Sequence, residues 1–135
     1  MKRILFLLAA VLAAVFAAVP ALAGSAHFVG APLVSVSGAS LTVSAKEAGL
    51  GDLAQIHVVL AGTASCINPG GHGPQAVNKT SFTAAADEPV QNGHSDYSLT
   101  ATAVFQPPCS PPMTVQFSDV TLTDTSSGIS GQVLP

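Results

Sequence analysis

The sequence contains several runs in which apolar and polar residues alternate, the pattern of half-buried β-strands. The clearest runs are residues 41–45, 56–66 and 97–105, and shorter ones occur at 34–36, 80–86, 115–122 and 129–134. In the second run, Ile56, Val58, Leu60, Ala64 and Cys66 share one face. Beyond position 24, no segment of ten or more residues keeps a helical period. The pattern therefore predicts strands throughout.

Turn-forming residues separate these runs. Gly38 and the pair Asn92 and Gly93 indicate tight turns. Further turns or loops are predicted at 46–52, 68–78, 87–89, 106–112 and 123–128, with at most one helical turn at 52–55. The apolar parity changes between Phe117 and Val120, which predicts a β-bulge near Ser118 and Asp119.

Seven to nine short strands in about 110 residues predict one all-β domain, an antiparallel β-sandwich of immunoglobulin-like type. A small barrel is the alternative. No tryptophan lies between the two cysteines, so the chain does not follow the spacing of an antibody domain.

The first 23 residues have the organisation of a secretory signal peptide. Lys2 and Arg3 precede an apolar run at 4–19, and Ala21 and Ala23 occupy the small positions of a cleavage site. An uncleaved membrane anchor is the alternative, since the apolar segment is long enough to span a bilayer. We expect cleavage after Ala23, leaving a secreted, extracellular domain at 24–135.

Charge excludes several function classes for residues 24–135. This segment has two lysines, no arginine and seven acids, a formal charge of −5 with neutral histidines. Two lysines are too few to neutralise the phosphates of nucleic acid or to hold an anionic membrane surface. We therefore expect that neither nucleic acid nor a membrane is a partner after signal cleavage. We also expect the domain to be a monomer.

Cys66 and Cys109 are the two cysteines of the chain. An even cysteine count in an exported domain predicts a disulfide, and a single pairing is possible. A redox or nucleophilic role is disfavoured because no C-x-x-C motif occurs and no basic residue neighbours either thiol in the sequence.

Several loop motifs resemble those of a group of small secreted proteins from filamentous GC-rich bacteria. These motifs are residues 46–51, 66–71, 78–80, 108–112 and 120–125. The group has no assigned activity, so the resemblance implies a secreted β-domain and no catalytic residue. It places the shared motifs mainly in loops, where binding residues often lie.

Metal binding and catalysis are weak hypotheses. His94 and Asp96 form an H-x-D pair whose side chains share one face of a strand, and His27, His57 and His72 are the other histidines. Asp87, Glu88, Asp119 and Asp124 are candidates for a glycosidase acid–base pair, but solvated turn acids are the simpler interpretation. No G-x-S-x-G motif is present. We therefore expect no catalytic residue, no metal and no cofactor.

The remaining hypothesis is a binding module. The disulfide would tie the 66–78 and 106–112 segments together at one end of the sandwich, where proline stiffens the chain. The candidate binding residues are Asn68, Gly70, Gly71, His72 and Asn78. Asn78 also begins an N-glycosylation sequon. The sequence thus predicts a non-enzymatic module for an extracellular protein or cell-envelope component, with a protease inhibitor or a small hydrolase as alternatives.

Overall fold

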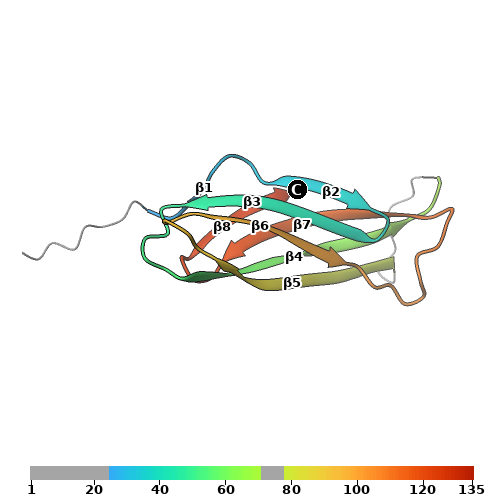
Figure 1. Ribbon diagram of the computed structural model, residues 1–135. Coiled ribbons are helices and arrows are strands. Elements are labelled where there is room, and N and C mark those ends of the chain that lie inside the picture. The colour runs from blue at the N-terminus through green and yellow to red at the C-terminus, as the bar shows by residue number, and fades with distance from the viewer. Residues whose placement is uncertain (1–24, 71–77) are drawn as a thin grey trace, which may run out of the picture.

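The computed structural model describes residues 25–70 and 78–135, which form two antiparallel sheets packed face to face (Figure 1). The eight strands are β1 (His27–Phe28), β2 (Leu33–Ser37), β3 (Ser40–Ala48), β4 (Gln55–Ile67), β5 (Lys79–Pro89), β6 (Ser95–Thr102), β7 (Thr114–Asp124) and β8 (Ile129–Leu134). These ranges contain no α-helix. The predicted all-β sandwich is confirmed. Within the described residues, nothing forms a helix long and apolar enough to cross a membrane.

The order of strands is that of a Greek-key sandwich. In the first sheet β6 pairs along one edge of β3, while β1 and β2 pair in succession along the other edge. The second sheet has the order β5-β4-β7-β8. The β3–β4, β5–β6 and β6–β7 connections each pass from one sheet to the other. This arrangement is the immunoglobulin-like sandwich that the sequence predicted.

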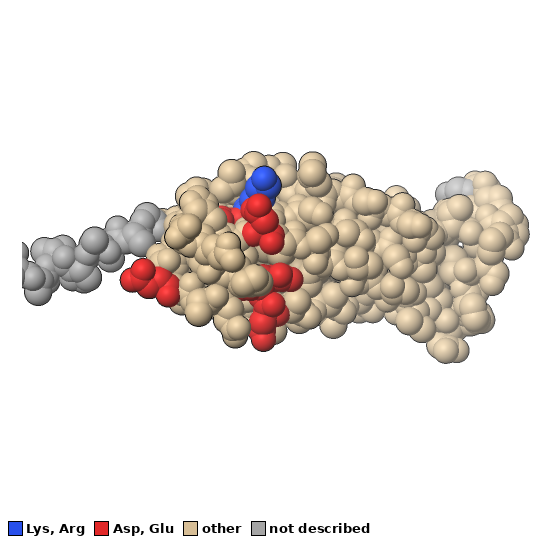
Figure 2. Space-filling view, in the orientation of Figure 1, with Lys and Arg blue, Asp and Glu red and all other residues tan. Residues whose placement is uncertain are grey.

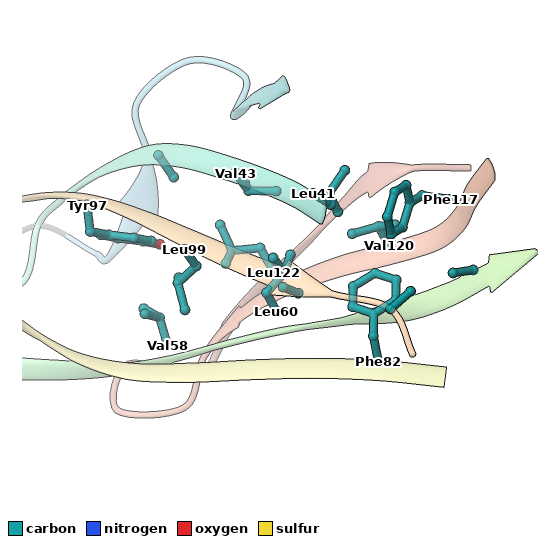
Figure 3. Close-up of a cluster of buried hydrophobic side chains, with 14 of the residues drawn as sticks. Leu41, Val43, Val58, Leu60, Phe82, Tyr97, Leu99, Phe117, Val120 and Leu122 are labelled. Atoms are coloured by element: carbon teal, nitrogen blue, oxygen red, sulfur yellow. The ribbon is translucent and has the colours of Figure 1, made fainter. Parts of the chain in front are cut away.

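The core lies between the sheets, because successive side chains of a strand point to opposite faces. The completely buried apolar side chains are Leu41, Val43, Ile56, Val58, Leu60, Ala64, Val120 and Leu122. Figure 3 shows that members of this cluster come from both sheets. The inward faces predicted for residues 56–66 and 97–105 are confirmed, and Ala103 and Phe105 stay buried although β6 ends at Thr102.

Gly62 occupies an inward position of β4 beside two aromatic rings. Phe82 and Phe117 meet edge to face, with ring centroids 5.4 Å apart and an interplanar angle of 86°. A Cβ atom on residue 62 would lie 2.8 Å from Cζ of Phe82 and 3.0 Å from Cγ2 of Val120. The missing side chain is therefore what lets the Phe82 ring lie against β4.

Hydroxyl side chains cover the outer face of the first sheet. Three cross-strand pairs join β3 to β6: Ser40 with Thr102 at 2.9 Å, Thr42 with Thr100 at 2.8 Å and Ser44 with Ser98 at 3.0 Å. Each pair satisfies polar groups across the strands without charge. This face is thus polar and uncharged along most of its length.

Local features of the chain match the sequence in part. Asn92 and Gly93 have positive φ angles of 52° and 76°, as a tight hairpin turn requires. Asp119 has φ 52° at the point where the β4–β7 register shifts, which confirms the bulge.

The predicted loop boundaries at the ends of β3 and β5 are wrong, whereas the expectation of at most one helical turn at 52–55 holds. Residues 87–89 continue β5 instead of turning, because they pair with β4. Lys46 and Glu47 belong to β3 instead of a loop, because they pair with β6. No helical turn forms at 52–55. Partners distant in sequence override the local turn signals in both strands.

The predicted disulfide joins Cys66, near the end of β4, to Cys109 in the β6–β7 connection. The sequence separation is 43 residues. This connection passes from the first sheet to the second. The disulfide therefore holds the connection covalently against the end of β4.

Replacing both Cys66 and Cys109 with alanine is expected to lower the free energy of unfolding by roughly 4 kcal/mol. The disulfide closes a loop of about 44 residues and restricts the unfolded ensemble accordingly. Urea denaturation of the oxidised protein and the double variant measures the difference. The wild type kept in reductant is the control and should match the variant, and equal midpoints for all three samples would contradict the prediction.

Gly62→Ala is expected to destabilise the protein by about 1–3 kcal/mol, since overpacking forces neighbouring side chains to move. Gly131→Ala is the matched control, because a Cβ atom there would come no closer than 3.4 Å to the Phe28 ring. Thermal unfolding compares the two variants. A Gly62→Ala variant as stable as Gly131→Ala would show that the Phe82 ring moves without cost.

Candidate functional site

The predicted binding loop lies only partly within the described residues. Asn68 and Gly70 are exposed just beyond β4, and Asn78 is half-buried just before β5. Gly71 and His72 fall outside the described ranges. The structure therefore places three of the five predicted residues at the disulfide end of the sandwich, and it records no side-chain hydrogen bond among those three.

A shallow apolar hollow accompanies this end. It has a volume of about 310 Å³ and is lined by Ala39, by residues 103–106 of the β6–β7 connection, and by Pro108 and Cys109. Val104 is 68% exposed beside it. The disulfide end thus offers an apolar surface held in place by a covalent bond.

A larger apolar surface, which no sequence pattern predicted, forms between β1 and β2. Phe28 pairs with Glu47 and Leu33 pairs with Ser44 along the same edge of β3. Four residues, 29–32, therefore lie opposite only two residues of β3, 45 and 46. Because four residues cannot all pair with two, this segment must bend away from the sheet. Gly30, with φ 71°, helps the chain turn away. Residues 29–32 are called the arch below, and Figure 1 shows the arch rising from the sheet between β1 and β2.

The arch encloses a groove on the outer face of the first sheet. The groove has a volume of about 360 Å³. Its wall consists of Val29, Ala31 and Leu33, and its floor consists of residues 44–46 of β3 and 96–97 of β6. Leu33 is 74% exposed and Val29 is 49% exposed. This hollow, called the arch groove below, is apolar on one side and charged at its floor.

Lys46 and Asp96 provide the charge. They are register partners on β3 and β6, and both side chains are exposed. Asp96 also lines a second, polar hollow of about 400 Å³, together with Gln91, Asn92 and His94. The two hollows therefore adjoin at Asp96.

Acidic residues surround this end of the molecule. Asp52, Asp87, Glu88 and Asp96 all lie near the ends of strands close to the arch. Figure 2 shows red side chains gathered toward this end of the visible face, and the opposite end is free of charge in that view. This end of the molecule is thus mostly acidic, although the charged residues that line the arch groove itself are Lys46 and Asp96.

The histidines of the described residues do not converge. His27 Nδ1 lies 2.8 Å from the backbone oxygen of Ser25, while His57 pairs with Asp87 across β4 and β5. His94 borders the polar hollow. Among residues 25–70 and 78–135, no group of three or more His, Cys, Asp or Glu side chains is placed to hold a metal ion.

The His57–Asp87 pair resembles half of a catalytic triad. His57 Nδ1 lies 2.7 Å from Asp87 Oδ1, and both side chains are about half exposed. Ser126 is near, but its hydroxyl accepts a hydrogen bond from the His57 backbone N–H at 2.9 Å instead of contacting the ring. In the described ranges the structure records no serine hydroxyl hydrogen-bonded to a histidine ring, so the serine–histidine contact of a triad is not formed there.

A buried polar cluster lies in the core below the arch. Glu47 of β3 is 1% exposed and Asp124 of β7 is completely buried. The Tyr97 hydroxyl of β6 donates a hydrogen bond to Glu47 Oε1. Asp124 Oδ1 accepts hydrogen bonds from the backbone N–H groups of Ser126 at 2.8 Å and Ser127 at 3.3 Å. Within the part of the chain that the structure describes, the other carboxyl oxygens, Glu47 Oε2 and Asp124 Oδ2, have no hydrogen-bond partner.

Burial changes the acidity of this cluster. Desolvation raises the pKa of Glu47 from 4.5 to about 7, and the Asp124 carboxylate adds to the increase, while the Tyr97 hydrogen bond opposes it. Burial, followed by the hydrogen bond to Glu47, raises the pKa of Tyr97 as well. Glu47 is thus an acid that titrates near neutral pH.

The sequence pattern did not predict burial of Glu47 or Asp124, whereas Tyr97 belongs to the inward face predicted for residues 97–105. Asp124 was interpreted as a solvated turn acid, which is wrong, because it shares the inward parity of Val120 and Leu122. Glu47 likewise continues the inward series of Leu41, Val43 and Ala45. The alternation would have revealed both acids if their strands had been extended by a few residues. Closed off from solvent, they are unsuited to act on a substrate.

No protein-family model matches this chain, and neither a characterised protein nor a solved structure matches it.

Addition of EDTA is expected to leave the melting temperature unchanged, since the described histidines and acids do not converge on a shared site. Differential scanning calorimetry with and without the chelator tests this, and His94→Ala is the control for the H-x-D pair. A chelator-dependent decrease that is absent in His94→Ala would reveal a metal site that includes His94.

Proposed function

We propose that this chain is a secreted, non-enzymatic binding module that receives an apolar side chain of an extracellular protein or cell-envelope component in the arch groove. The observation that carries the proposal is the groove itself, an apolar wall raised from the sheet by the register mismatch of β1 and β2. A volume of about 360 Å³ suits one large side chain or a small ligand. Secretion rests on residues 1–23, which lie outside the described ranges.

The charge of Asp96 indicates which type of residue would lie next to the apolar side chain in the partner. Asp96 lies where the arch groove meets the polar hollow, and further acids surround this end. A basic group next to the apolar side chain would therefore be attracted to Asp96. We infer a partner segment in which an apolar residue is followed by a lysine or arginine.

The shape of the molecule favours binding over catalysis. The His57–Asp87 pair has no serine against its ring, and the Glu47–Asp124 carboxyls are closed off from solvent. Pairing of β1 and β2 with β3 holds both ends of the arch, which lowers the entropic cost of binding. A protease inhibitor would be one form of such a module.

The disulfide end is the second candidate surface. Val104 and the adjoining hollow are exposed there, and Cys109 in the lining is bonded to Cys66, two residues before Asn68. The resemblance to secreted bacterial proteins also emphasises loops at this end. A partner that binds this surface would depend on Val104 and not on Leu33.

Leu33→Asp is expected to weaken partner binding by about tenfold or more, since burying a leucine side chain contributes roughly 1.5–3 kcal/mol. The probe is a displayed library of random linear peptides selected on the purified protein. Dissociation constants of the enriched peptides are then measured by fluorescence anisotropy. Enriched sequences should join an apolar residue to a basic one, and Asp96→Asn should weaken them.

Val104→Asp is the matched control, because it places the same charge on an exposed apolar position at the other end. It should leave the affinity unchanged. A loss of affinity in Val104→Asp alone would assign binding to the disulfide end, and failure to enrich any peptide sensitive to Leu33→Asp would overturn the arch groove as the site.

A further inference from the structure

Each sheet contributes one buried carboxyl group to the same point in the core. Glu47 lies near the end of β3 in the first sheet, and Asp124 ends β7 in the second. Their side chains are close enough for the Asp124 carboxylate to influence Glu47. Among residues 25–70 and 78–135, no hydrogen-bond partner is found for Glu47 Oε2 or Asp124 Oδ2, in an interior where such groups are normally satisfied.

No base compensates this pair within the described residues. The other titratable group in contact is Tyr97 on β6, whose hydroxyl is already donated to Glu47. Glu88 on β5 adds a further negative influence, on Tyr97. Lys46 is exposed on the outer face of β3, and His57 of β4 is held by Asp87. Lys79 is remote, since it pairs with Ser65 near the disulfide end.

A single proton would satisfy both unpartnered oxygens. Two carboxylates facing each other in a low-dielectric site repel, whereas a carboxylic acid can donate to a carboxylate in a strong, charge-assisted hydrogen bond. We propose that Glu47 and Asp124 share one proton that ties the two sheets together, and that its loss loosens the end of the sandwich opposite the disulfide. This inference does not depend on the proposed binding function.

The segments that would loosen adjoin the two acidic residues, one through the Asp124 carboxyl and the other through the backbone at Glu47. Asp124 Oδ1 holds the β7–β8 turn through the N–H groups of Ser126 and Ser127. Glu47 is the register partner of Phe28 in the two-residue strand β1, which anchors one foot of the arch. The Val29 N–H bonds the neighbouring Lys46 carbonyl at 2.8 Å. Charge on Glu47 would therefore act on the turn and the arch together.

The direction of the pH dependence follows from the pKa of Glu47, which is higher in the folded state than in the unfolded state. The folded state holds the Glu47 proton to about pH 7, whereas the unfolded state releases it near pH 4.5. The stabilisation is complete below pH 4.5 and is lost as pH rises toward 7. This change corresponds to an increase in the unfolding equilibrium constant on the order of 100-fold between pH 4.5 and 7.5.

Carboxyl ¹³C NMR of the wild type, titrated against pH, tests the shared proton without any substitution. Glu47 should titrate near neutrality, and the Asp124 carboxyl signal should respond in the same pH range. Titration of Glu47 near pH 4.5 in the folded protein would overturn the proposal.

Amide hydrogen exchange tests the loosening. After correction for intrinsic rates, protection of the Ser126 and Val29 amides should decrease as the pH rises from 4.5 to 7.5, while Ala64 near the disulfide end stays protected. Glu47→Gln, which keeps an acceptor for Tyr97 and adds a neutral donor toward Asp124, should abolish this pH dependence. Asp124→Asn is the second variant, should Glu47→Gln fail to fold. Equal pH dependence in the wild type and a folded variant, or equal loss of protection at both ends, would contradict the proposal.

Discussion

The two sheets pack face to face, and most inward positions of the central strands β3, β4 and β7 are buried, whatever residue occupies them. For leucine, valine and isoleucine this burial supplies the stability of the fold. The same geometry buries Glu47 and Asp124, because pairing with β6 extends β3 through position 47 and pairing with β4 extends β7 to position 124. Gly62 shows the reverse effect, since an inward position opposite Phe82 has no space for any side chain. The strand pairing thus decides which residues meet in the core, and the core then determines their acidity and packing.

Most of this fold is predictable from the sequence because alternation and turn residues are local signals. The sandwich, the Cys66–Cys109 disulfide, the Asn92 turn and the bulge at Asp119 all follow from neighbouring residues. The ends of β3 and β5 do not, because residues 46–47 and 87–89 have turn-like composition but find partners across the sheet. The arch is still less predictable. It arises because β1 and β2 pair with the same edge of β3 and the chain between them has more residues than the edge has partners. No single residue type predicts this mismatch.

The surface has few charged residues, and serine and threonine hydroxyl groups supply much of its polarity. The three hydroxyl pairs between β3 and β6 make the outer face of the first sheet polar while leaving it uncharged. The charged residues are instead concentrated at the end that carries the arch, with Lys79 and Asp119 as exceptions. This separation leaves the sandwich with one acidic end and one apolar, disulfide-bonded end. The two ends therefore present different chemistry to any partner.

The arch lies outside both strand pairings that flank it. Residues 29–32 can change in length or identity without shifting the register of β1 or β2 against β3, because each register is fixed by its own residues. Surface segments of this kind accept insertions more readily than paired strands. In evolutionary terms the arch is a place where sequence can vary while the scaffold stays constant. Related chains can be expected to diverge first at these four positions, as antibody loops diverge on a common framework.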